Sequence, residues 1–229
     1  MLTFTIPQNE EFIEIQEQPI RLIIAGWTGR DADKVQEHIE ELAAIGVPKP
    51  STVPVFYQVS ASRLTQSENI QVVGNGESGE VEFVLANIGG DIYVGLGSDH
   101  TDRDAEVHGI TLAKQMCDKP ISHELWALND VLEHWDHIEL EARIRIHQEQ
   151  HIYQKGSVAD MLHPVDLLNK LAASRHGEPL QPGEWMMCGT LPAIGGIKPA
   201  HHFSMRLHDP VRNRSIFKEY SITNLDING

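Results

Sequence analysis

Residues 79–97 read GEVEFVLANIGGDIYVGLG, and this stretch indicates the fold class. Two runs rich in Val, Ile, Phe and Tyr flank the dipeptide Gly89-Gly90, which is typical of two antiparallel strands joined by a tight turn. In the first run, Glu80 and Glu82 alternate with apolar residues, so both carboxylates lie on the same face of the strand. The stretch therefore predicts a hairpin that presents paired acidic side chains.

Further strands are expected on both sides of this hairpin. The alternation of apolar and charged residues is strictest from Ile138 to Ile146, which predicts a half-buried strand. Shorter strands are expected within 2–25 (LTFTI, FIEI and IRLIIAG) and at 53–59, 185–188, 202–207 and 216–222. The sequence thus predicts an α+β fold with more strand than helix.

Helices are expected in fewer places. The clearest follows the N-cap residue Asp31, where apolar residues recur at spacings of three and four until Gly46 and Pro48 end the pattern. Other helical segments are expected over 104–116, over 125–135 as a short irregular helix, from Ser157, and from Pro164 to Gly177. We expect one structural unit, in which residues 1–50 supply strands and a lid-like helix and residues 51–229 form the core.

Composition and charge narrow the class of protein. The chain has 229 residues and a formal charge of −15, which argues against a nucleic-acid partner because such binding draws on clustered Lys and Arg. Neither a membrane-spanning run nor a secretion signal is visible, so we expect a cytoplasmic chain with no membrane partner. The two cysteines, Cys117 and Cys188, lack metal-ligand spacing and are expected to be reduced, buried thiols.

A third carboxylate follows the second strand of the hairpin. Asp99 lies in GSDHTDRD, after a strand and a glycine, where an acidic side chain can reach a cleft. Together with Glu80 and Glu82 it forms an oxygen-rich set suited to a hard cation such as Mg²⁺, Mn²⁺ or Ca²⁺. From pattern alone, a solvated strand face remains the alternative interpretation.

Several blocks of the sequence resemble the fumarylacetoacetate hydrolase superfamily. The run from Glu80 through YVGLGSDHTDRDAE is similar to its Glu-x-Glu and Asn-Asp-x-x-x-Arg-Asp segments, TLAK at 111–114 to its lysine segment, and LQPGEWMMCGTLPAIGGI at 180–197 to its Thr-Gly-Thr-Pro signature. The blocks SGEVEFVL, GSDHTDR and HWD resemble a bacterial branch of unknown function. The resemblance covers roughly residues 20–222 and implies a β-rich fold of mixed sheets with few helices.

Carried over by position, the resemblance assigns roles to single residues. It implies that Glu80, Glu82 and Asp99 bind the metal and that Lys114 lies beside it and polarises the substrate. It also implies that Thr190 holds a substrate carboxylate.

Two further positions adjoin these. The resemblance implies the same substrate-binding role for Arg103, whose planar fork can meet a carboxylate bidentately, although an intradomain ion pair remains the alternative. His100, next to Asp99, is the histidine expected nearest the site and is predicted to bind substrate. Ser98 and Cys188 depart from the family pattern and indicate a reshaped pocket.

The superfamily's hydrolases and decarboxylases often carry a His-x-x-Glu pair on a short helix that covers the site. His38 and Glu41 stand at that spacing, and on a helix they could touch, so that the carboxylate orients the imidazole as a general base. The family's Asn-Tyr-x-x-His-x-x-Glu lead-in is absent. A plain helix-face pair is therefore the alternative.

The resemblance implies a metal-dependent hydrolase or lyase that acts on a small 2-oxo or diketo acid. The reaction would be C–C bond hydrolysis, decarboxylation or tautomerisation, with negative charge developing on an enolate held at the metal. The alternative is a noncatalytic protein that keeps the fold and binds a metal or a small molecule. Members of the superfamily are commonly homodimers, and the same is expected here.

Overall fold

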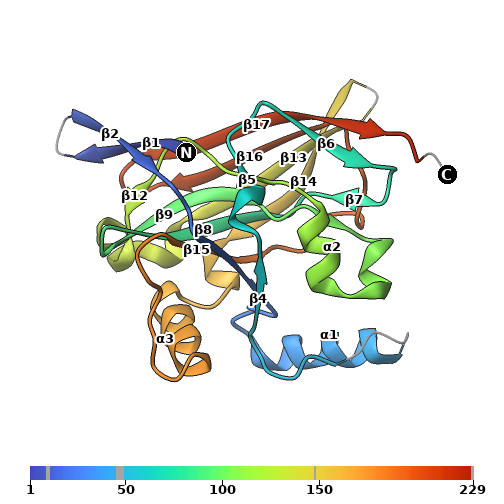
Figure 1. Ribbon diagram of the computed structural model, residues 1–229, viewed down its shortest axis with the longest axis horizontal. Helices are drawn as coiled ribbons and strands as arrows, with labels where there is room; N and C mark the ends of the chain where they lie inside the picture. Colours follow the sequence, from blue (N-terminus) through green and yellow to red (C-terminus); the bar gives the residue numbers. More distant parts are fainter. Residues whose placement is uncertain (9–10, 45–48, 147, 228–229) are drawn as a thin grey trace.

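The computed structural model describes residues 1–8, 11–44, 49–146 and 148–227, with the side chains of Gln8, His38, Glu41 and Leu42 outside that description. Two large sheets dominate the described chain, and the three α-helices lie around them (Figure 1). The α+β architecture with more strand than helix is therefore confirmed.

A six-stranded sheet carries the predicted hairpin near its centre. Its strands, in spatial order, are β12 (Trp126–Ala127), β9 (Asp91–Ser98), β8 (Val81–Ile88), β15 (Glu184–Thr190), β3 (Arg21–Gly26) and β4 (Val55–Val59). β8 and β9 pair antiparallel from Val81 opposite Ser98 to Ile88 opposite Asp91. Gly89 and Gly90 form the turn with φ of 66° and 106°, values that residues with a side chain rarely adopt.

A five-stranded sheet packs against one face of the first. Its strands, in spatial order, are β14 (Glu149–Ser157), β13 (Glu139–Ile146), β16 (His202–Asp209), β17 (Arg214–Leu225) and β6 (Asn69–Val73). In β13 the alternation predicted from sequence buries Leu140, Ala142 and Ile144 in the main core. Phe83 of β8 meets Trp135 edge to face at 4.9 Å in the same core. The strands β14 and β6 were not predicted.

The other face of the six-stranded sheet has a smaller core. Phe4 stacks on Trp185 of β15 with ring centroids 5.0 Å apart, and Ile24, Val84 and Met187 join the same cluster. Three two-stranded ladders lie around the large sheets: β1 (Leu2–Gln8) with β2 (Glu11–Glu17), β7 (Glu77–Ser78) with β10 (Thr101–Asp102), and β5 (Leu64–Thr65) with β11 (Lys119–Pro120).

The helices are α1 (Ala32–Ala44), α2 (Ile110–Met116) and α3 (Pro164–Ser174), with short 3₁₀ turns η1 (Ala61–Arg63), η2 (Ala105–His108), η3 (Leu128–Asp130), η4 (Leu132–His137) and η5 (Val158–Asp160). In Figure 1, α1 and α3 lie at the bottom of the view and the long strands of the five-stranded sheet run along the top. Among the described helices, none is long and apolar enough to cross a membrane.

Sequence patterns placed these helices with mixed accuracy. Asp31 caps α1 as predicted, because its carboxylate accepts the backbone N–H groups of Asp33 and Lys34, each at 3.2 Å. The single helix predicted over 104–116 is wrong: it is divided into η2 and α2 at Gly109, whose φ of 139° is not helical. Ser157 caps only the short turn η5 rather than a longer helix.

The main core generates a stability prediction. We expect Phe83→Ala to lower the free energy of unfolding by about 3–5 kcal/mol, because Phe83 is fully buried against Trp135 and its removal leaves a cavity. Phe217→Ala on β17, where the side chain is 57% exposed, should cost no more than about 0.5 kcal/mol. Chemical denaturation of both variants measures the difference, and equal losses would contradict this account of the core.

Candidate functional site

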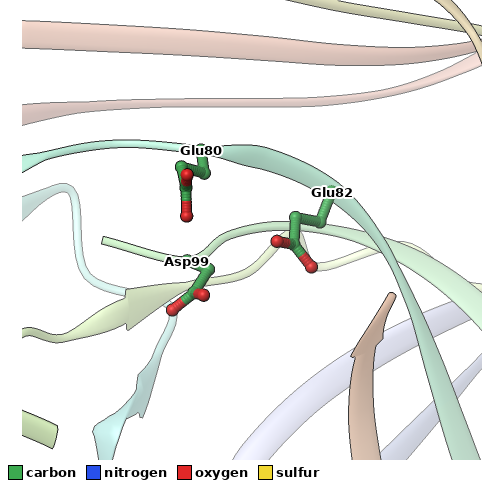
Figure 2. Close-up of side chains that lie close together, drawn as sticks. All are labelled: Glu80, Glu82 and Asp99. Atoms are coloured by element: carbon green, nitrogen blue, oxygen red, sulfur yellow. The ribbon is translucent and has the colours of Figure 1, made fainter. Parts of the chain in front are cut away.

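Three carboxylates converge where β8 and β9 meet. Glu80 precedes β8 and Asp99 follows β9, and the backbone N–H of Asp99 donates to the Glu80 carbonyl at 2.9 Å, which continues the pairing of the two strands. Glu82 lies two residues beyond Glu80 and so projects from the same face. Carboxylate oxygens of all three residues lie within 4.8 Å of one another. Figure 2 shows their carboxyl groups pointing toward a common space.

The Glu82 carboxylate is buried in this cluster. Its Oε2 accepts the backbone N–H of Gly189 at 2.8 Å, a hydrogen bond made possible by a bulge in β15 between Met187 and Thr190. Burial raises the pKa of Glu82 well above its ordinary value, and the neighbouring charges of Asp99 and Glu80 raise it further. Without a cation, Glu82 therefore tends to hold a proton.

Two lysines neutralise Asp99, which is itself fully buried. Lys114 of α2 donates to one oxygen of Asp99 and lies 3.6 Å from Glu80. Lys119 lies 3.1 Å from the other oxygen, an ion pair without the angle of a hydrogen bond. Burial alone would raise the pKa of Asp99, but the two ammonium groups lower it, so this carboxylate stays ionised.

The same charges act on Lys114. Burial alone would lower the pKa of its amine, yet Asp99 and Glu80 outweigh this effect and raise it. Lys114 is therefore a cation and a hydrogen-bond donor in the described cluster. Its role beside a metal stays a prediction.

Arg103 also reaches the cluster, through Glu80. Its guanidinium lies 3.0 Å from Glu80 and 3.1 Å from Glu106, and its Nε donates to the Ser78 hydroxyl at 2.8 Å. This is the intradomain ion pair that the sequence left open as the alternative. A direct role of Arg103 on substrate stays a prediction.

Thr190 faces the beginning of β8. Its hydroxyl donates to the Val81 carbonyl at 2.7 Å and accepts from the Gln154 amide at 2.7 Å, while Gln154 accepts the Val81 N–H at 2.9 Å. Gln154 thus ties β14 to both β8 and β15. The predicted contact of Thr190 with a substrate carboxylate stays untested.

His100 points away from the three carboxylates. One ring nitrogen contacts Glu77, the other lies 2.5 Å from the Tyr220 hydroxyl, and the side chain is fully buried. Both nitrogens are therefore occupied within the described structure. Substrate binding by His100, expected from its place in the sequence, would require these contacts to break.

His38 and Glu41 fall on α1, but their side chains lie outside the described residues, so the general-base pair stays a prediction. The segment that leads into α1 is firmly attached. Gly29 forms a bridge with Met161, and both terminal nitrogens of Arg30 donate to Asp136 at 2.8 Å. The residues just before α1 are therefore held against Met161 and Asp136.

Sequence reasoning missed two residues that support the cluster. Gln154 stands in the segment QKG, whose similarity to the family's Gln-x-Gly could have identified it. Lys119 had no such signal, because a buried lysine is recognised only once β11 places it against Asp99, where its Nζ also donates to the backbone carbonyls of His100 and Lys114.

The donor set fits a divalent cation with oxygen preference. Three carboxylates within 4.8 Å, two of them almost inaccessible to solvent, match the ligands that Mg²⁺ and Mn²⁺ take in proteins. The described residues give Glu82 a single hydrogen bond, which leaves its other oxygen available as a ligand.

Comparisons with known proteins identify the family of the chain. Residues 25–220 match the model of a family described as a protein of unknown function, DUF2848. The chain belongs to this family. The match agrees with the branch predicted from SGEVEFVL, GSDHTDR and HWD. A search of curated proteins found no match.

Solved structures share the fold at low sequence identity. Cg1458 superposes with a TM-score of 0.61 and 14% identity, over 92% of this chain and 78% of that one. A 2-keto-3-deoxy-D-arabinonate dehydratase complexed with magnesium and 2,5-dioxopentanoate superposes with a TM-score of 0.60 and 9% identity, over 96% of this chain and 86% of that one. These similarities confirm the β-rich fold that the resemblance implied.

The raised pKa of Glu82 predicts how stability depends on pH in the presence of a chelator. The native state holds this proton more tightly than the unfolded state, whose pKa is near 4.5, so stability is lost as pH rises through the folded pKa. Glu82→Gln cannot lose a proton. Relative to wild type, its free energy of unfolding should therefore increase with pH above about 4.5, by at most about 1.4 kcal/mol per pH unit. Urea denaturation between about pH 5 and 8 measures this difference, and parallel curves would contradict it.

Proposed function

We propose that the protein is a divalent-metal-dependent enzyme that acts on a small 2-oxo or diketo acid. The reaction class is C–C bond hydrolysis, decarboxylation or tautomerisation. One observation carries the proposal: Glu80, Glu82 and Asp99 place carboxylate oxygens within 4.8 Å of one another beside the ammonium group of Lys114. In this proposal the three carboxylates hold Mg²⁺ or Mn²⁺, with Ca²⁺ as an alternative.

A cation held there would supply Lewis-acid polarisation of the substrate's oxo and carboxylate oxygens. The remaining chemistry falls to the chain's own groups. Lys114 carries a raised pKa, so it acts as a hydrogen-bond donor and positive charge toward an oxygen that becomes negative during the reaction, and not as a base. If Lys114 moves toward a substrate, Asp99 still has a positively charged partner, because Lys119 pairs with its other oxygen.

Other residues fix the carboxylates before substrate arrives. The Gly189 N–H orients Glu82, Lys119 orients Asp99, and Arg103 orients Glu80. Each carboxylate thus has one partner that differs from those of the other two. Such preorganisation lowers the cost of assembling the site around a charged ligand.

The proposed reactions differ in their need for a base. Hydrolysis of a diketo acid requires an activated water, a role that His38 and Glu41 of α1 would fill if they act as a pair. Decarboxylation and tautomerisation need only charge stabilisation at the developing enolate and a proton donor. The structural similarity to a dehydratase complexed with magnesium and 2,5-dioxopentanoate supports a small oxo compound as the substrate class.

Metal binding is the first consequence to test. In thermal unfolding, we expect Mg²⁺ or Mn²⁺ at about 100 times its dissociation constant to raise the melting temperature by roughly 5–10 °C, and oxalate to raise it further, because a ligand of the folded state stabilises it by mass action. Glu82→Ala should lose both shifts. Glu141→Gln, a similarly buried strand carboxylate bound by Arg143 and Lys155, should keep them.

The outcomes separate the alternatives. Equal shifts of the melting temperature in wild type and Glu82→Ala would show that the carboxylates do not bind the metal, and the proposed enzyme function would then be wrong. Binding of metal and oxalate without turnover of any member of a panel of 2-oxo and diketo acids would instead identify a noncatalytic binding protein.

A second prediction concerns Lys114. Lys114→Met should reduce turnover of a substrate found in that panel by about 10²–10³-fold, because a preorganised donor to developing negative charge is lost. Its Mg²⁺ affinity should be retained or increased, since the ammonium group that now occupies Asp99 and Glu80 is removed. Calorimetric titration with Mg²⁺ and steady-state kinetics separate the two effects, and loss of Mg²⁺ binding would contradict the assigned role.

A further inference from the structure

A tyrosine that no part of the proposed site uses lies at the same end of the six-stranded sheet. Tyr57 belongs to β4 and pairs with Ile24 of β3. Tyr57 packs on the apolar cluster that contains Ile24, Val84 and Met187. Glu82 and Val84 are two residues apart on β8 and project from the same face, so Tyr57 and Glu82 lie on the same side of the sheet.

The ring of Tyr57 leans along the sheet toward the carboxylates. A Cβ atom on Gly26 would lie 2.8 Å from Cε2 of Tyr57, so the ring occupies the space that a side chain at position 26 would fill. Gly26 is two residues beyond Ile24, at the end of β3 that adjoins the bulge of β15. That bulge holds Gly189, whose N–H donates to Glu82.

The hydroxyl of Tyr57 is held by the next residue of the chain. Trp27 and Tyr57 share a side-chain hydrogen bond. An indole N–H can only donate, so the Tyr57 oxygen accepts and its own hydrogen remains available to another group. None of the hydrogen bonds recorded among the described residues uses that hydrogen.

The backbone of Trp27 is strained in a way that functional sites often are. Its φ is 60°, a left-handed conformation that is uncommon for a bulky residue and costs free energy. The strained residue stands between β3 and the segment leading into α1. The residue with the strained backbone is therefore the same residue that hydrogen-bonds the Tyr57 hydroxyl.

Two charged side chains lie near this phenol, one of them Lys114 of the proposed site. Lys114 and Glu106 both lie near enough to act on it electrostatically, and Gln115 of α2 accepts the Ser60 N–H at 2.7 Å, which ties α2 to the end of β4. Burial raises the pKa of Tyr57, so the hydroxyl keeps its proton at neutral pH. It is therefore a neutral hydrogen-bond donor near Lys114 of the cluster.

We propose that Tyr57 donates a hydrogen bond to an oxygen of the oxo-acid ligand bound at Glu80, Glu82 and Asp99, and that Trp27 is its positioning residue. The inference rests on the proposed function and adds to it a neutral donor that comes from β4, in addition to the ammonium group of Lys114. The site then favours a ligand with an acceptor oxygen on the side of Gly26.

Calorimetric titration tests this with two probes, Mg²⁺ alone and oxalate in saturating Mg²⁺. Tyr57→Phe should weaken oxalate binding by about tenfold, the loss of one hydrogen bond to a charged acceptor, and leave the Mg²⁺ dissociation constant unchanged within about twofold. Trp27→Phe keeps an aromatic side chain but removes the indole donor, and should weaken oxalate binding by about threefold. Tyr93→Phe, a tyrosine of β9 packed on the same cluster, is the matched control and should bind as wild type does.

The results distinguish this inference from the function on which it rests. If wild type binds oxalate and Tyr57→Phe binds it equally well, Tyr57 does not contact the ligand, whereas the proposed function stands. If Tyr57→Phe weakens the binding of Mg²⁺ and of oxalate in parallel, the role of Tyr57 is structural and the inference is wrong. If wild type binds no oxalate in Mg²⁺, the proposed function and the inference fall together.

Discussion

The pairing of β8 with β9 is the constraint on which the candidate site depends. Opposition of Val81 and Ser98 places Glu80 beside Asp99, and the hydrogen bond from the Asp99 N–H to the Glu80 carbonyl extends the ladder by one step. A slip of one residue in this register would turn one strand's carboxylates to the opposite face. The glycine turn at Gly89 and Gly90 and the apolar residues of β8, buried on both faces, hold the register in place.

Burying three carboxylates close together is electrostatically unfavourable, and nearby cationic side chains offset part of this cost. Three negative charges in little space would repel one another, yet Lys114, Lys119 and Arg103 supply three positive charges around them. Among the described residues no cation forms an ion pair with Glu82, and burial together with the charges of Asp99 and Glu80 raises its pKa. The charges of Asp99 and Glu80 are therefore neutralised by nearby cationic side chains, whereas the charge of Glu82 is left for an added cation to neutralise. A divalent ion would relieve the remaining repulsion, which links metal binding directly to the ionisation of one residue.

The sequence predicted what depends on local pattern. The period of two in GEVEFVL and in residues 138–146 predicted strands, and Asp31 predicted the start of α1, because alternation and capping act within a few residues. The carboxylate set followed from the hairpin and from the resemblance. Lys119 could not be predicted, because it reaches Asp99 only through the pairing of β11 with β5, two segments distant in sequence. Gln154 was identifiable only from the similarity of QKG to the family's Gln-x-Gly, because its contacts with Val81 and Thr190 also join distant segments. The break at Gly109 was missed since apolar spacing across 104–116 does not show a nonhelical φ.

Two glycines near the carboxylates leave space that side chains from neighbouring segments fill. A Cβ on Gly189 would lie 1.7 Å from the Thr28 hydroxyl oxygen, and one on Gly26 would meet the Tyr57 ring, so side chains from neighbouring segments cover positions that carry none. The carboxylates can therefore stay fixed while the covering residues change. Proteins with the same fold and an equivalent acidic cluster can then differ in the side chains that lie over these glycines, which in this chain are Thr28 and Tyr57.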